Sequence, residues 1–175
     1  MTRSTLLVLG LGLGLAVALI ALASCSTAGA AYFPQPDATT ITGSARVGER
    51  ALVGVADLVA ADGDRVELIG VTPVNLGGSP RVSAWVVRRR DLGGGGIGFT
   101  TTRGLPSALD FASLARPLEP FAFTSADGPI QVVLAVESSE AGAVTFDGVR
   151  VSFRVAAAEW TQTFRTSAAV TFESP

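Results

Sequence analysis

Hydrophobic residues follow two different patterns along the 175-residue chain. Residues 6–23 form one uninterrupted apolar run that contains only Leu, Val, Ile, Ala and Gly. From about residue 45 onward, short β-branched runs are separated by Gly, Pro or Asp at intervals of about 8–12 residues, which is typical of a β-sandwich or a β-barrel. The pattern therefore predicts an all-β domain that follows a separate apolar segment.

Two of the short runs alternate clearly between apolar and polar side chains. In residues 65–71, Val66 and Leu68 share one face of a strand, and residues 145–155 repeat this arrangement. Residues 130–136 are apolar almost throughout, so we expect a central strand that is buried on both faces. Further strands are predicted for residues 51–58, 81–87, 120–124, 160–165 and 170–172. Together the runs predict an antiparallel, immunoglobulin-like β-sandwich of seven or eight strands.

The regular spacing of strands stops between residues 91 and 119. This long crossover begins with the glycine-rich stretch 93–98, which we interpret as a mobile tip. Residues 107–110 resemble a capping box, so one short helix is predicted from about residue 108 to residue 115, ending before Pro117. We expect the crossover to form a lid over one end or edge of the sandwich.

The first 25 residues are organised as an export signal. A short polar stretch with a single charge, Arg3, precedes the apolar run, which ends in Leu22-Ala23-Ser24-Cys25. This ending resembles the lipobox of bacterial lipoproteins. In that family the cysteine thiol receives a diacylglycerol, and a dedicated peptidase cuts the chain just before this cysteine.

The resemblance implies a lipoprotein signal peptide over residues 1–24 and lipidation of Cys25. It also implies that the lipid holds the protein on the extracytoplasmic face of the cell membrane. Ordinary secretion and an uncleaved anchor stay open as alternatives, because the apolar run is near the lower limit for a membrane-spanning helix. Residues 25–43, rich in Ala, Ser, Thr and Pro, are predicted to be a flexible tether, and residues 44–175 the sandwich domain. Two alternatives stay open for Tyr32 and Phe33, the only large apolar residues of this tether: docking on the domain, or a position at the bilayer surface.

Composition excludes several kinds of chemistry. The chain has no histidine, no lysine and one cysteine. Serine–histidine and serine–lysine catalytic pairs, histidine ligands to a metal and an intrachain disulfide are therefore impossible. The formal net charge of −2 argues against non-specific nucleic-acid binding, which needs a basic excess. We expect a protein that is not an enzyme, does not bind nucleic acid and requires no cofactor or metal.

The densest group of charges is Arg88-Arg89-Arg90. In an extended strand Arg88 and Arg90 face one way and Arg89 the other. Arginine suits carboxylate and phosphate groups, so one hypothesis is an anion site. The other, which we favour, is a solvated strand end that protects a sheet edge against aggregation.

Two functional hypotheses follow from these features. The first is a non-enzymatic binding or assembly module at the bacterial cell envelope, anchored in the membrane through acylated Cys25, with another envelope protein as its partner. Alternating runs of Val, Phe and small polar residues resemble, in type, accessory envelope lipoproteins with immunoglobulin-like domains. The second is a carrier of a small apolar ligand or lipid, with residues 91–119 as a lid over a cavity.

Overall fold

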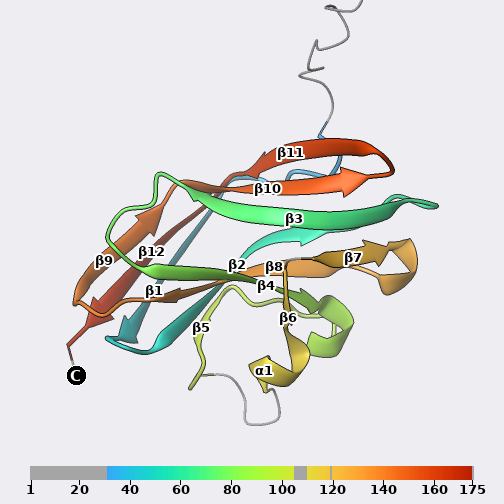
Figure 1. Ribbon diagram of the computed structural model, residues 1–175. Helices are drawn as coiled ribbons and strands as arrows, with labels where there is room; N and C mark the ends of the chain where they lie inside the picture. Colours follow the sequence, from blue (N-terminus) through green and yellow to red (C-terminus); the bar gives the residue numbers. More distant parts are fainter. Residues whose placement is uncertain (1–30, 105–109, 119, 175) are drawn as a thin grey trace, which may run out of the picture. The chain divides into compact units, whose positions relative to one another are not determined.

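The alternating runs fold into strands, and residues 31–104, 110–118 and 120–174, which the computed structural model describes, form a β-sandwich (Figure 1). The predicted all-β sandwich is thereby confirmed. The strands in these ranges are β1 (Thr39–Arg46), β2 (Arg50–Leu58), β3 (Arg65–Val74), β4 (Arg81–Arg88), β5 (Phe99–Thr101), β6 (Arg116–Pro117), β7 (Phe121–Thr124), β8 (Ile130–Glu137), β9 (Gly142–Phe146), β10 (Gly148–Val155), β11 (Ala158–Phe164) and β12 (Thr166–Glu173). The helices are α1 (Phe111–Leu114) and two 3-10 helices, Arg89–Leu92 and Ser125–Asp127. Within the same ranges, no helix has the length and apolar character to cross a membrane.

The strands are arranged in two layers. One sheet has the order β5-β2-β8-β4-β6 and the other the order β11-β10-β3-β7. Only Asp147 separates β9 from β10, and only Arg165 separates β11 from β12. A bridge between Gly77 and Thr145 continues the pairing of β3 with β10 onto β9. The set β1-β12-β9 is therefore a bent extension of the second sheet. Because of these bends and the short strands β5, β6 and β7, the described residues contain more strands than the seven or eight predicted.

The order of the long strands is that of an immunoglobulin-like sandwich. Strands β2, β8 and β4 occupy the places of B, E and D, and strands β3, β10 and β11 those of C, F and G. The prediction of antiparallel pairing is wrong for one pair, because β1 runs parallel to β12 from Thr39 beside Thr166 to Arg46 beside Glu173. No hairpin forces these two strands to be antiparallel, since nearly the whole domain separates them in sequence.

The central strand is β8, as the apolar run predicted. All side chains from Ile130 to Val136 are buried, because the two faces of the sheet are both covered. Leu134 faces the main core between the sheets, whereas Val133 belongs to a second apolar cluster on the outer face. From the opposite sheet, Val151 also enters the main core and is fully buried.

The chain joins the folded domain earlier than expected. Phe33 is fully buried in the main core, its N–H donates to Oε1 of Gln162 over 3.0 Å, and Nε2 of Gln162 donates back to the Phe33 carbonyl over 2.8 Å. The folded unit therefore begins at Ala31, and the predicted tether over residues 25–43 is wrong for residues 31–43. The physical reason is that burial of the Phe33 ring at the open edge of the sandwich contributes more free energy than the loss of conformational entropy costs when the segment is ordered.

The crossover covers the outer face of the first sheet, which the prediction of a lid over an end or edge did not foresee (Figure 1). The edge part of that prediction is borne out, because β5 pairs with β2 and β6 with β4 at the two edges of that sheet. Its backbone is fixed to that sheet: the Ile97 N–H donates to Oε1 of Gln131 over 2.7 Å, and the Gly54 N–H donates to the Gly98 carbonyl over 3.0 Å. Apolar side chains of the sheet, Leu52 among them, pack beneath this layer.

The helix in the crossover is shorter than predicted and begins later. α1 spans Phe111–Leu114, and the Asp110 carboxylate caps it by accepting a hydrogen bond from the Ala112 N–H. The cap is therefore the last residue of the predicted 107–110 capping box. Residues 105–109 lie outside the described part of the chain.

Replacing Gly54 with alanine should destabilise the domain by about 1–3 kcal/mol, as overpacking commonly does. A Cβ atom at this position meets the Ile97 carbonyl oxygen at 1.8 Å, so the crossover has to move off β2. Urea unfolding measures the loss. The matched control is Gly98→Ala, because a Cβ atom there has nothing within 4 Å. Equal stability of both variants would refute this account of the contact.

Candidate functional site

The structure separates the three arginines that the sequence placed in one strand. Arg88 ends β4, and Arg89 and Arg90 begin the 3-10 helix Arg89–Leu92. The expectation that Arg88 and Arg90 share one face of a strand is therefore wrong. The chain has to turn here because it leaves the sheet to cross the outer face.

Each of these arginines lies near a carboxylate, and for Arg90 this is Asp91, whose Oδ1 lies 3.8 Å from Nε of Arg90. Nη2 of Arg88 lies 3.1 Å from Oδ1 of Asp127, and Nη1 of Arg89 lies 2.8 Å from Oδ2 of Asp57. The Thr124 N–H and the Arg88 guanidinium hold the pKa of Asp127 below its usual value, so this partner stays ionised at neutral pH. Acids of the same chain thus occupy the positions that an external anion would take, which favours a structural role for the cluster.

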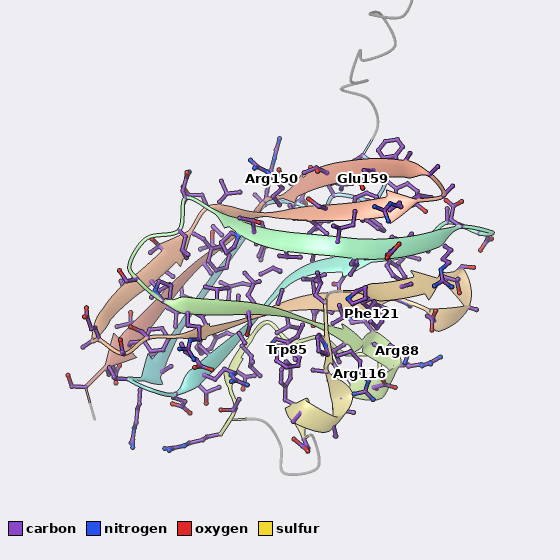
Figure 2. The ribbon with its side chains drawn as sticks, viewed as in Figure 1. Trp85, Arg88, Arg116, Phe121, Arg150 and Glu159 are labelled. Atoms are coloured by element: carbon purple, nitrogen blue, oxygen red, sulfur yellow. The ribbon has the colours of Figure 1, made fainter. Side chains whose placement is uncertain are left out.

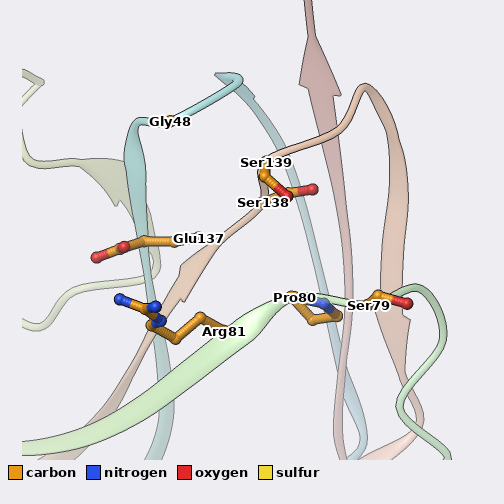
Figure 3. Close-up of a pocket in the computed structure, with 7 residues that line it drawn as sticks. All are labelled: Gly48, Ser79, Pro80, Arg81, Glu137, Ser138 and Ser139. Carbon is orange, nitrogen blue, oxygen red and sulfur yellow. The ribbon is translucent and has the colours of Figure 1, made fainter.

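A hollow of about 410 Å³ lies at one end of the sandwich, where three loops meet (Figure 3). We call this the hollow end: residues 47–49 between β1 and β2, residues 75–80 between β3 and β4, and residues 138–141 between β8 and β9. The lining residues are Gly48, Ser79, Pro80, Arg81, Glu137, Ser138 and Ser139. Serine hydroxyls and two opposite charges make it a polar, hydrogen-bonding surface.

Three neighbouring strands place the charges of the hollow end side by side. Glu137 ends β8, and it lies opposite Arg50 of β2 on one side and opposite Arg81 of β4 on the other. Its carboxylate lies 2.6 Å from Nε of Arg50, so Glu137 and Arg50 form a salt bridge. Figure 3 shows the Arg81 and Glu137 side chains pointing to the same side, away from Ser138 and Ser139. Arg81 is exposed, so its guanidinium is accessible from the solvent.

The β3–β4 loop is held in one shape. Nδ2 of Asn75 donates to Oδ2 of Asp147 over 2.9 Å, and the Gly77 N–H donates to the Thr145 carbonyl over 2.8 Å. Asn75 has a φ of 54°, a left-handed conformation that asparagine tolerates better than most residues. Between these two fixed points Leu76 is exposed to 40%. The hydrogen bonds on either side of Leu76 thus hold the backbone that presents this apolar side chain to the solvent.

The turn on the other side of the hollow carries a fixed negative charge. Hydrogen bonds from the Thr101 hydroxyl and the Arg46 N–H hold the pKa of Glu49 below its usual value. The Arg46 N–H lies 3.1 Å from Oε2 of Glu49. The hollow end therefore combines fixed acids, an exposed arginine and one exposed leucine.

The other sequence-predicted site, Cys25, lies outside the described residues. Nothing in the described ranges assembles three acidic or cysteine side chains around a metal position. The hollow end is not among the sites that the sequence predicts. Its local signal was the turn-forming sequence Asn75-Leu-Gly-Gly-Ser-Pro80. That signal marks a loop, but it does not show that residues 138–141 lie beside it.

No protein-family model and no curated protein sequence matches the chain.

Proposed function

We propose that the chain is a bacterial lipoprotein, held at the extracytoplasmic face of the cell membrane through acylated Cys25. In this proposal the sandwich is a non-enzymatic binding module for another envelope protein, which it contacts through the hollow end. The support for the anchor is the sequence Leu22-Ala23-Ser24-Cys25 at the end of an 18-residue apolar run, residues 6–23. The support for the module is the geometry of the folded unit.

The observation that carries the proposal is the opposite placement of the two ends. At one end the folded unit begins, since the Tyr32 hydroxyl donates to Oδ2 of Asp64 over 2.7 Å in the β2–β3 turn. We call this the N-terminal end: residues 31–33, the turn 59–64 and the turn 156–157. The hollow end lies at the far ends of β2, β3, β4 and β8 (Figure 1). A chain anchored at Cys25 therefore enters the folded unit at the end opposite the hollow end.

The carrier hypothesis receives less support. Under the crossover, Leu52 and Val133 are fully buried, and the Trp85 ring packs edge-on against Phe111 with centroids 5.9 Å apart. These side chains pack against one another beneath the described part of the crossover. Figure 2 shows Trp85 and Arg116 on this side of the molecule, whereas Arg150 and Glu159 lie on the opposite sheet. The packing of this layer favours a structural cover.

A photoreactive benzophenone amino acid at position 139 tests the binding role in living cells. Ser139 is exposed in the hollow, so irradiation should give one discrete adduct with an envelope protein. The matched control is the same probe at Thr72, an exposed position of β3 on the outer face of the second sheet. Adding Arg81→Glu to the position-139 variant should remove the adduct, because it reverses the charge offered to the partner. No adduct at position 139, or the same adduct at both positions, contradicts the proposal.

A further inference from the structure

The N-terminal end carries a surface that fits a lipid bilayer. We propose that this end rests on the membrane surface, with Trp160 at the level of the lipid headgroups. This inference rests on the proposed anchor at Cys25 and adds an orientation to it. In this arrangement the folded domain itself contacts the bilayer, in addition to the acyl chains of the anchor.

The short connection to the anchor is the first observation. The folded unit begins at Ala31, six positions after Cys25. At about 3.3–3.6 Å per residue, this stretch of chain reaches about 20 Å at most. Tyr32, the second residue of the unit, contacts Asp64 in the β2–β3 turn, and its ring centroid lies 6.3 Å from that of Trp160. The β2–β3 turn and Trp160 are therefore within reach of the bilayer whenever the acyl chains are inserted in it.

Exposed apolar side chains are the second observation. The large hydrophobic residues exposed in the described ranges are Val59 at 46%, Leu76 at 40% and Trp160 at 39%. Leu76 belongs to the hollow end, whereas Val59 starts the β2–β3 turn and Trp160 lies on β11. Ala156 to Ala158, at the β10–β11 turn, are exposed as well. An indole ring has an apolar body and a polar N–H, a combination that prefers the membrane–water interface.

Charge does not drive this contact. The β2–β3 turn carries two acids, Asp62 and Asp64. The chain has no lysine, so no ammonium group is available to attract anionic lipid headgroups. The guanidinium of Arg154 is engaged by Glu67 and Glu159 on its own sheet. We therefore commit to the uncharged part of the bilayer surface as the partner, and we expect the contact to persist when salt is raised. Anchoring by lipid makes the contact intramolecular, so even a weak affinity suffices.

The test uses the lipidated protein in phosphatidylcholine vesicles. Because acylation consumes the thiol of the only natural cysteine, Ala157→Cys supplies a unique site for an environment-sensitive fluorophore. The matched control is Ser139→Cys, an exposed residue of the hollow end. We expect a blue shift and roughly half the emission to be lost to lipid-borne quenchers at position 157, with neither at position 139. The result should be the same in low and in high salt.

Intrinsic fluorescence gives a second measurement that does not depend on the label. The chain has two tryptophans, Trp85 under the crossover and Trp160 beside Tyr32 of the N-terminal end. In Trp85→Phe, brominated lipids should quench the remaining Trp160; in Trp160→Phe, they should leave Trp85 unquenched. Quenching of neither residue, of Trp85 alone or of both equally overturns the inference. Mass spectrometry of the same sample shows whether Cys25 is acylated, so failure of the orientation and failure of the anchor are distinguishable.

Discussion

Replacing Phe33 with alanine is expected to lower the free energy of unfolding by about 3–5 kcal/mol, the usual cost of removing a fully buried phenylalanine. The ring is 0% exposed, and its centroid lies 4.7 Å from that of Phe153 and 6.4 Å from those of Phe123 and Phe164. Truncation therefore leaves a cavity among three aromatic rings. Urea unfolding of the mature chain, followed by tryptophan fluorescence, measures the loss.

The matched control for Phe33 is Gln35→Ala in the same segment. Gln35 is exposed, and its Nε2 donates to the Thr163 carbonyl over 2.9 Å. Losing an exposed hydrogen bond of this kind should cost about 1 kcal/mol or less. If Phe33→Ala is no more destabilising than Gln35→Ala, residues 31–37 form a tether after all, and the folded domain begins at β1.

Replacing Cys25 with alanine should abolish fatty-acid labelling of the protein. Cys25 is the only cysteine, so no other thiol can receive the diacylglycerol. Without that modification the signal should stay attached, and the protein should migrate as a larger precursor. Each buried methylene adds about 0.8 kcal/mol of anchoring, so two or more long chains bind firmly to the bilayer. Metabolic labelling with a clickable fatty acid, read on a gel, measures both effects.

Ser24→Ala is the matched control for the cysteine variant. It changes the neighbouring residue but keeps a small side chain, so labelling and processing should continue as in the wild type. Persistent labelling of Cys25→Ala would contradict the lipoprotein proposal. So would normal processing of that variant to the mature size.

Strands were predictable where the hydrophobic pattern is local. The alternation of residues 65–71 and the apolar run 130–136 identified β3 and β8, because the hydrophobic pattern within each strand indicates which of its side chains are buried. The strand β1 was missed because its partner, β12, lies more than a hundred residues later, and most of its side chains are exposed. Docking of Phe33 on the domain was one of two alternatives that the sequence left open, and local sequence does not decide between them because its hydrogen-bond partner is Gln162.

The candidate site was less predictable than the fold. The arginine cluster stood out in the sequence, but the turn into a 3-10 helix and the pairing of Arg89 with Asp57 depend on where the crossover runs. The hollow end had the opposite problem. Its residues, such as Ser79 and Ser139, are ordinary turn residues, and only the register of β4 against β8 brings their loops together.

The most direct test of the account is the mass of the N-terminal peptide of the protein isolated from its own membranes. The lipoprotein proposal predicts a peptide that begins at Cys25 and carries a thioether-linked diacylglycerol on the sulfur, with or without a further acyl group on the new amino terminus. A mature protein that begins at any other residue, or a peptide with a free thiol at Cys25, would contradict the account.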